Sequence, residues 1–255
     1  KTDASIIVFC GVHFMAETAK ILNPNKKVLL PVMKAGCKMA NMINPDALKK
    51  YKDEHPNTKI ITYVNSTASV KALSDCICTS TNALKIINHY LDNGDDILYC
   101  PDQNLGKYAM KLSGKTFDVW PGCCPIHHFL DVKKILELKR KNPGAKLIAH
   151  PECQPELLEQ ADYIGSTKQL ICYAKSDSCN CFIVATEKGV LHQMNKDSPN
   201  KKFIIASNTL SCVNMKYTKL EDVYNVLSEE TNEIFVDEEI SKKALKALDK
   251  MMELS

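Results

Sequence analysis

The sequence predicts an α/β fold of three similar units around a shared axis, and three observations support this prediction. A pattern of apolar strand, polar turn, helix and second apolar strand recurs about every 87 residues. Each copy leads to one cysteine, and these cysteines, Cys37, Cys124 and Cys212, lie 87 and 88 residues apart. Short β-branched runs alternate with helices, which indicates parallel sheets with right-handed crossovers. Three equivalent thiols further suggest one shared ligand.

The copies can be compared directly. They read IIVFCGVHFMAETAK then KKVLLPVMKAGC, DILYCPDQNLGKYAMK then KTFDVWPGCC, and CFIVATEKGVLHQMNK then KKFIIASNTLSC. A different half-repeat precedes the second and third copies: KIITYVNSTASVKAL with CTSTNAL, and KLIAHPECQPELLEQ with GSTKQL. Within it, Tyr63 and His150 lie 87 residues apart. Both follow strands, at the end where parallel sheets bind ligands.

The first copy begins without this leading half, whose counterpart is expected roughly 26 residues upstream of Lys1. The chain is therefore expected to be a fragment or a trimmed form of a protein with three domains. The expected divisions are 1–45 as the C-terminal half of the first domain, 46–130 as the second domain, 131–217 as the third, and 218–255 as C-terminal helices that pack back on the other domains.

Local signals mark several helix ends. Asn44 is expected to cap a helix over 46–54 that ends before Pro56, and Asp131 a helix that Asn142-Pro143-Gly144 stops. Thr218 and Glu221 predict a capping box for a helix to about residue 229. The last segment has one apolar face, expected to pack on another domain, formed by Ile240, Ala244, Leu245, Leu248, Met251 and Met252.

Composition excludes several classes of protein. With 45% hydrophobic and 25% charged residues, the 255-residue chain is typical of a globular protein, and it lacks the apolar run of about 18 residues that a membrane span needs. The net charge of +3 comes without a basic run, which argues against nucleic acid as a partner. Twelve cysteines without a CxxC motif favour a reduced, cytoplasmic protein and exclude zinc ribbons and thioredoxin-like sites.

Several polar residues near strand ends are candidates for chemistry. His150-Pro151-Glu152 joins a group that titrates near neutrality to a carboxylate, and it could equally be a satisfied core pair. Tyr63 and Asn65 offer a phenol and an amide. Ser80 and Thr167 lie in turns before helices, where a hydroxyl either caps the helix or binds an anion. The CxC pairs, Cys76/Cys78 and Cys179/Cys181, are interpreted as buried apolar residues.

Ten motifs in order resemble the quinolinate synthase family, the NadA-type enzymes of bacterial NAD synthesis. They are GVHFMAE, AGC, YVNS, CTS, PDQNLG, CCPIHHF, HPEC, ADYIGST, ATEKG and CVNM, and they run from about residue 6 to residue 217. The resemblance implies three αβα domains with small parallel sheets around a pseudo-threefold axis. It also implies a 4Fe-4S cluster and the condensation of iminoaspartate (iminosuccinate) with dihydroxyacetone phosphate, with possible functional coupling to L-aspartate oxidase.

The resemblance assigns roles to residues of this chain. The cluster ligands are Cys37, Cys124 and Cys212; Cys123 competes with Cys124, but the family's ligand directly precedes Pro-x-His. Three thiolates leave one iron free to act as a Lewis acid. Tyr63, His150 and Glu152 are expected to be catalytic. The expected substrate contacts are Tyr63, Val64, Asn65, Ser80, His150, Pro151, Glu152, Ser166 and Thr167. His127 and Glu187 are expected in the cavity wall, and His13 and His192 in structural positions.

Two alternatives remain at this stage. One is a non-catalytic iron-sulfur or metal-binding sensor on the same three-domain frame, which would need the cysteines but not the convergent polar residues. The other is a metal-free sugar-phosphate enzyme with incidental cysteines. An anaerobic absorption spectrum distinguishes the second alternative from the other two.

Overall fold

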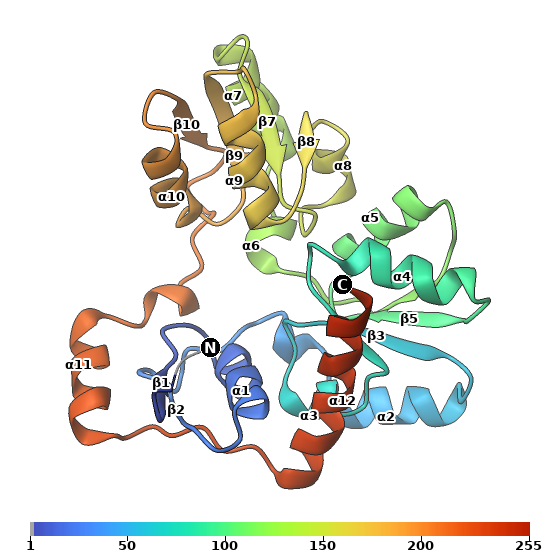
Figure 1. Cartoon of the computed structure of the whole chain (residues 1–255). Coiled ribbons are helices and arrows are strands. Elements are labelled where there is room, and N and C mark those ends of the chain that lie inside the picture. Colours follow the sequence, from blue (N-terminus) through green and yellow to red (C-terminus); the bar gives the residue numbers. More distant parts are fainter. Residues whose placement is uncertain (1–2) are drawn as a thin grey trace.

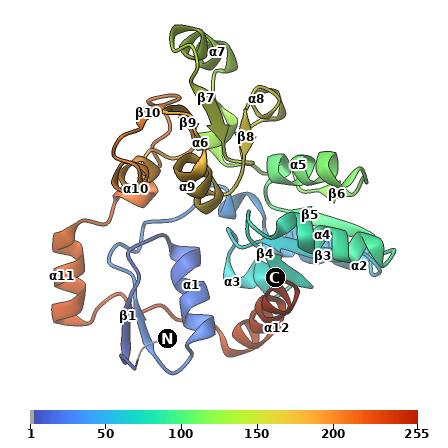
Figure 2. The same ribbon diagram turned by 45° about the horizontal axis from the view of Figure 1, so that its top comes forward.

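The computed structural model describes residues 3–255, which form three small sheets with helices packed around them. Every pair of neighbouring strands within these sheets is parallel. Figure 1 shows the three units at the corners of a triangle, and Figure 2 shows the same arrangement from a second direction. The predicted α/β fold class is confirmed.

The second unit contains a four-stranded sheet in the order β4-β3-β5-β6. Its strands are β3 (Lys59–Tyr63), β4 (Cys76–Cys78), β5 (Ile97–Cys100) and β6 (Asp118–Val119). Its helices are α2 (Pro45–Glu54), α3 (Ala68–Lys71), α4 (Ala83–Asp92), α5 (Gln103–Ser113) and α6 (Pro125–His128). A 3-10 turn at Ala40–Met42 precedes α2, and its Ala40 packs with Val12 and Phe14 of the first unit.

The third unit repeats this topology in the order β8-β7-β9-β10. Its strands are β7 (Lys146–Ala149), β8 (Tyr163–Ile164), β9 (Cys181–Ala185) and β10 (Lys202–Ile205). Its helices are α7 (Val132–Lys141), α8 (Pro155–Leu158), α9 (Thr167–Ser176) and α10 (Val190–Asp197), with a 3-10 turn at Asn214–Lys216. The same strand order in both sheets is what the sequence repeat requires.

The first unit pairs β1 (Ile6–Val8) with β2 (Lys27–Leu29), and α1 (His13–Leu22) connects them. This strand-helix-strand unit matches β5-α5-β6 and β9-α10-β10. Among the described residues, the first sheet contains these two strands only.

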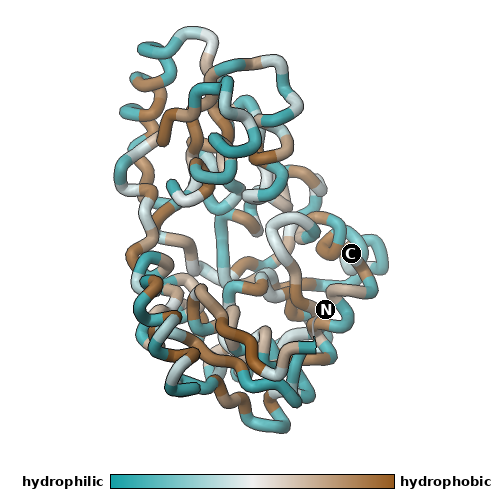
Figure 3. The backbone as a smooth tube through the Cα atoms, turned by 60° about the vertical axis from the view of Figure 1, so that its left-hand side comes forward, coloured by the Kyte–Doolittle hydropathy of each residue, from teal (hydrophilic) through white to brown (hydrophobic). Residues whose placement is uncertain are grey.

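Successive side chains of a strand point to opposite faces of the sheet, and in both four-stranded sheets helices pack on each face. Ile61 and Tyr63 contribute to the core beneath α4 and α5, whereas the intervening Ile60 packs with residues of α2 and α3. In the third unit, Leu147 faces α7 and α8 while Ile148 faces α9 and α10. The alternating apolar and polar stretches of the backbone are visible in Figure 3.

Two predicted helix starts are confirmed and one is corrected. The Asn44 side chain accepts hydrogen bonds from Asp46 N and Ala47 N, and Asp131 accepts one from Lys134 N. The predicted box of Thr218 and Glu221 is wrong by one residue. Helix α11 (Leu220–Glu229) begins after Lys219, whose backbone N–H donates to the Asp222 carboxylate at 2.8 Å. An acidic pair at 221–222 allows either register, and the chain takes the later one.

The C-terminal helix α12 (Glu238–Leu254) packs against α1 of the first unit and against α3, α4 and β4 of the second. Ala244, Ala247 and Leu248 form a core cluster with Ile21 of α1 and Ile77 of β4. Met252, expected on this face, is 56% exposed, and the smaller Ala247 is buried instead. The buried face of α12 is therefore turned slightly from the expected one, so that the small side chains of Ala244 and Ala247 contact the neighbouring elements. No described helix is both long and apolar enough to cross a bilayer.

Candidate functional site

A cavity of about 720 Å³ lies where the three units meet. The expected residues that line it are Cys37, Tyr63, Val64, Asn65, Ser80, Cys124, His127, His150, Glu152, Thr167, Glu187 and Cys212. Pro151 and Ser166 are buried beside it but do not line it. Cys123 does not line it either, and its backbone N–H contacts Met42 Sδ at 3.4 Å. The fold thus gathers residues that are up to 175 positions apart, from Cys37 to Cys212, around one space.

The repeat explains how two of these residues reach the cavity. Tyr63 ends β3, and His150 follows the last residue of β7. Thr62 pairs with Cys100 as Ala149 pairs with Ala185, so Tyr63 and His150 occupy equivalent positions one residue later. Both residues therefore lie at the carboxyl end of the strand that comes first along the chain in their sheet, β3 or β7.

Ser80 and Thr167 are also equivalent, since each lies three residues beyond Ile77 and Ile164, which occupy the same register in β4 and β8. Thr167 is the first residue of α9, and the cap is Ser166, whose hydroxyl accepts from Gln169 N at 3.4 Å. Thr81 Oγ1 donates to Ser166 Oγ at 2.9 Å, which joins the second unit to the third. Because Ser166 performs the capping, the Thr167 hydroxyl is free to face the cavity.

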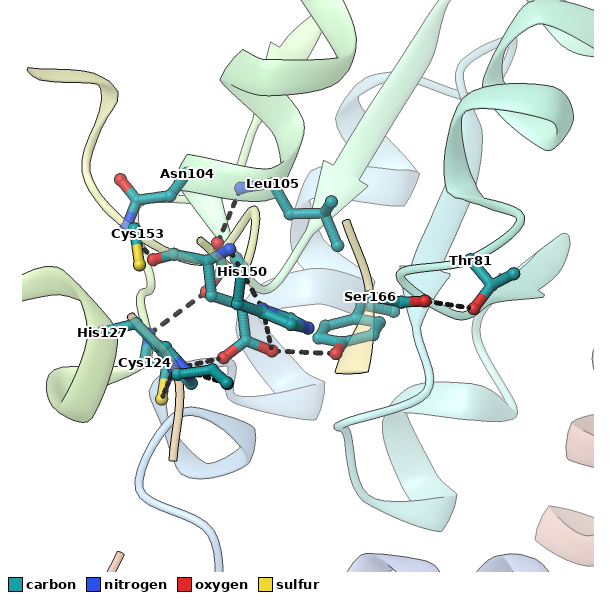
Figure 4. A network of polar contacts seen from close by, with 12 residues as sticks. Thr81, Asn104, Leu105, Cys124, His127, His150, Cys153 and Ser166 are labelled. Carbon is teal, nitrogen blue, oxygen red and sulfur yellow. Dashed lines mark hydrogen bonds and ion pairs between the residues drawn. The ribbon is translucent and has the colours of Figure 1, made fainter. Parts of the chain in front are cut away.

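Glu152 belongs to a polar network whose members Asn104, His127 and His150 are labelled in Figure 4. Its Oε1 accepts a hydrogen bond from Tyr63 Oη at 2.8 Å, and its Oε2 lies 2.9 Å from His127 Nδ1. The backbone N–H of Glu152 donates to His150 Nδ1 at 3.3 Å, and its carbonyl accepts from Asn104 Nδ2 at 2.8 Å. Both the side chain and the backbone of Glu152 are therefore fixed.

Burial and charge set the protonation of this network. Burial lowers the pKa of His150 to about 4, partly offset by Glu152, so its ring is neutral near pH 7. Burial acts to raise the pKa of Glu152, but the adjacent imidazoles of His150 and His127 and the Tyr63 hydroxyl lower it below its usual range. The pKa of Tyr63 is well above 10, first because of burial and then because of Glu152. The site thus holds an ionised carboxylate beside a protonated phenol.

His127 takes part more directly than the sequence indicated. Besides its contact with Glu152, its Nδ1 lies 3.2 Å from Cys124 Sγ, and its Nε2 lies 3.0 Å from Thr186 Oγ1. We assign the ring proton to Nδ1, facing the carboxylate, so that Nε2 accepts from the threonine. The spacing of Cys124 and His127 on one turn of α6 was a signal for this contact. Thr186 gave no signal, because its partner belongs to another repeat.

Comparison with known proteins agrees with this geometry. A family model described as "Quinolinate synthetase A protein" matches residues 1–253. The chain is 47% identical over 255 residues to the quinolinate synthase of Alkaliphilus metalliredigens, covering 100% of this chain and 84% of that protein. It is 46% identical over 260 residues to the quinolinate synthase of Trichodesmium erythraeum, covering 100% of this chain and 80% of that protein.

The chain belongs to the quinolinate synthase family. It is therefore an enzyme with a role in NAD biosynthesis, and family membership does not favour the sensor alternative. A further quinolinate synthase, from a Geobacter species, is 47% identical over 252 residues and covers 99% of this chain and 82% of its own length.

The donor atoms of this quinolinate synthase family member fit a metal group. One thiol from each unit lines the cavity. Burial raises the pKa of Cys37 and of Cys124, so a bound cation is needed to keep these thiols ionised near neutral pH. Among residues 3–255, the ligand atoms of Cys124, His127 and Glu152 lie within 4.8 Å of one another. This group contains one of the three cysteines that line the cavity, together with two members of the Glu152 network.

Proposed function

We propose that the chain condenses iminoaspartate (iminosuccinate) with dihydroxyacetone phosphate to form quinolinate, with loss of phosphate and water. The observation that carries this proposal is that the three repeated cysteines and the Tyr63–Glu152–His127 network line the same cavity. A volume of about 720 Å³ is within the range of small-molecule sites. The chemistry then requires anion recognition, proton transfer and a group that helps oxygen to leave.

Anion recognition is assigned to hydroxyl and amide groups at the ends of the second and third sheets. Ser80 and Thr167 line the cavity from equivalent positions, and Asn65 lines it from the loop after β3. Thr167 opens α9, whose first backbone N–H groups favour a negative charge. These three residues are proposed to bind substrate carboxylate or phosphate oxygens.

Proton transfer is assigned to Tyr63, His150 and Glu152. The Tyr63 hydroxyl and the neutral His150 ring both keep their protons near pH 7, so each offers a hydrogen-bond donor to the reacting groups. Since His150 Nδ1 accepts from a backbone N–H, its own proton is on Nε2. Glu152 is the proposed base that removes a proton from a substrate carbon or nitrogen, with His127 and Tyr63 holding its two oxygens.

Cys37, Cys124 and Cys212 are proposed to hold a 4Fe-4S cluster. Three protein thiolates leave one iron able to act as a Lewis acid toward a substrate carboxylate or hydroxyl. His127 would support this site from the protein side, because it contacts both Cys124 Sγ and the Glu152 carboxylate.

The direct test is quinolinate formation by the anaerobically reconstituted protein, supplied with dihydroxyacetone phosphate and freshly generated iminoaspartate. Product is measured by chromatography, and iron and sulfide are measured in the same sample. We expect quinolinate only when iron and both substrates are present. Product formation that is equal with and without iron would contradict the cluster's role, and the absence of product from iron-loaded protein would contradict the proposed reaction.

The unstable imine substrate must come from a reaction that oxidises an amino acid, which supports coupling to L-aspartate oxidase. The twelve cysteines are free thiols in the structure, which supports a reducing, cytoplasmic location. We further propose that the second and third units act as domains over residues 46–130 and 131–217.

A further inference from the structure

In each unit, the loop that carries the cysteine is hydrogen-bonded in the same way to the start of the preceding helix, α1, α5 or α10. A backbone N–H in the first turn after the strand donates to a carbonyl two residues before the cysteine. These hydrogen bonds run from His13 N to Ala35 O (2.7 Å), from Gln103 N to Gly122 O (2.8 Å) and from Lys188 N to Leu210 O (2.8 Å). The three bonds align the units residue by residue and make Val12, Asp102 and Glu187 equivalent.

In the second unit, the Asp102 side chain provides a second link between the cysteine loop and the helix start. Its Oδ2 accepts from the backbone N–H of Cys124 at 3.1 Å, while Oδ1 accepts from Leu105 N at 2.8 Å and caps α5. Asp102 is fully buried. One carboxylate therefore joins the cysteine loop to a helix that is packed in the core.

Glu187 does the same in the third unit with a longer side chain. Its Oε1 accepts from the backbone N–H of Cys212 at 3.2 Å, and its Oε2 accepts from Gly189 N at 2.7 Å. Lys216 forms an ion pair with the same carboxylate at 3.2 Å. Each acidic residue thus accepts from the N–H of its cysteine and from a backbone N–H near the helix start, three residues on for Asp102 and two residues on for Glu187.

The first unit has Val12 at this position, which offers no acceptor to Cys37. The Cys37 loop is held from another unit instead, since Asn214 Nδ2 donates to Gly36 O at 2.8 Å. Asn214 lies two residues after Cys212. The Cys37 loop therefore keeps the hydrogen bond from His13 N of its own helix, but its second hydrogen bond comes from the third unit.

We propose that Asp102 and Glu187 are positioning residues that fix the Cys124 and Cys212 loops before metal binds, whereas the Cys37 loop remains adjustable and is aligned through Asn214. The inference rests on the proposed function in that the three cysteines are taken as metal ligands. A side chain that accepts from two backbone N–H groups fixes both of them, and loss of one acceptor oxygen leaves a buried N–H without its partner. With Cys124 and Cys212 already in position, the Cys37 loop can adjust last, after a metal group has entered the cavity.

The first experiment is hydrogen-deuterium exchange of the iron-free protein. Asp102→Asn leaves one acceptor oxygen for two N–H groups, so we expect the Cys124 amide to exchange about 10-fold faster, with Cys212 unchanged. Glu187→Gln should give the reverse pattern, and Asn214→Ala should affect only the segment around Cys37. Asp131→Asn is the matched control, because Asp131 caps α7 through Lys134 N and touches no cysteine loop. Lys216→Met removes the ion pair while keeping Glu187.

Equal acceleration at all three cysteines in Asp102→Asn would indicate general loosening and overturn the inference, as would no acceleration at any of them. The second readout is the rate at which reconstituted protein loses iron to a chelator. We expect about 10-fold faster loss in Asp102→Asn and Glu187→Gln than in Asp131→Asn, and equal rates would overturn the positioning role. If the unaltered protein holds no iron, the proposed function fails, while the exchange pattern still decides whether the two carboxylates fix their loops.

Discussion

At the scale of single residues, Glu152 is the group that the surrounding structure constrains most tightly. Its side chain is 5% exposed, so its charge has left water, and such a charge is tolerated only when its oxygens are paired. Tyr63 and His127 provide this pairing from the second unit. The carboxylate therefore links the second and third units, and its chemistry depends on their relative placement.

We expect Glu152→Gln and Tyr63→Phe each to lower the rate of quinolinate formation by a factor of about 10², because each removes a group held in position for proton transfer. Iron content and the folded state should be retained. The measurement is steady-state kinetics with iron analysis. Tyr51→Phe is the control, since Tyr51 Oη donates to Asp118 Oδ2 at 2.7 Å in a similar pair at an exposed position. Near-normal rates for both site variants would remove their catalytic assignment.

Serine at Cys37, Cys124 or Cys212 should abolish binding of the proposed cluster, because each substitution removes one of the three thiolates proposed to hold about four irons. The measurement is iron content after anaerobic reconstitution. Serine at the exposed Cys10 and Cys172, or at the buried Cys100 outside the cavity, should leave iron nearly unchanged. The adjacent pair gives the sharpest comparison: loss of iron in Cys123→Ser with retention in Cys124→Ser would reverse our assignment.

Sequence could identify those site residues that the repeat itself marks. Tyr63 and His150, and likewise Ser80 and Thr167, recur at fixed spacing, and the structure gives each pair the same register. The contacts of His127 with Glu152 and Thr186 could not be predicted this way, because they cross between units. A repeat reports which positions are equivalent and not which positions meet.

At the scale of secondary-structure elements, the short helix α3 places a lysine in the protein interior. Lys71 is fully buried, donates to the carbonyl of Ser66 and lies 5.3 Å from the Phe14 ring centre. Burial lowers its pKa from 10.5 to about 7, against the opposing charge of Glu17. Nothing in the local sequence marks this lysine as buried, since its cover comes from α1 and α12.

This lysine makes stability depend on pH in a direction that can be worked out. Between about pH 7 and 10.5 the unfolded chain holds a proton on Lys71 that the folded protein has released, so the free energy of unfolding rises with pH. The slope approaches about 1.4 kcal/mol per pH unit above the folded pKa, and this contribution is flat well below it. Lys71→Met should remove the slope. The stability of the unaltered protein relative to this variant should therefore increase from about pH 7 to about pH 8.5.

Urea unfolding across this pH range measures the difference between the two proteins. Lys201→Met is the matched control for lost donor and ring contacts, because Lys201 donates to Ala174 O at 2.8 Å and lies 5.6 Å from the Phe182 ring centre. A constant difference between Lys71→Met and the unaltered protein at every pH would contradict the lowered pKa of Lys71.

The helix boundaries show how much of the fold can be predicted from local sequence. Asn44 and Asp131 act as predicted, because a cap bonds within its own turn. At α11, two adjacent acidic residues offered two starts, and local sequence did not decide between them. The burial of Ala247 instead of Met252 likewise depends on how closely α12 approaches its neighbours. Local bonds were predictable, and the rotation of a helix against distant elements was not.

At the scale of the whole molecule, the cavity exists only while three units keep their relative positions. Each unit contributes one cysteine, so a small rotation of one unit moves its thiol away from the other two. The second and third units are joined by Tyr63 to Glu152 and by Thr81 to Ser166. The first unit relies on Asn214 at one side and on α12 at the other.

We therefore expect Leu248→Ala to weaken both the fold and the site. Leu248 is 1% exposed and shares a core cluster with Ile21 of the first unit and Ile77 of the second. Removing its side chain leaves a cavity at this junction and should lower the free energy of unfolding by about 2–5 kcal/mol. The first unit should then move more freely, and the reconstituted protein should lose iron faster because Cys37 belongs to that unit.

Met252→Ala is the control on the same helix, since its side chain is 56% exposed and its loss should change stability by less than about 0.5 kcal/mol. Thermal unfolding and the rate of iron release to a chelator are measured on both variants. If Leu248→Ala lowers stability while iron release stays at the Met252→Ala rate, α12 supports the fold without setting the position of Cys37. Faster iron release in Leu248→Ala, below its unfolding temperature, would show that the junction of α12 with the first two units holds the three cysteines in place.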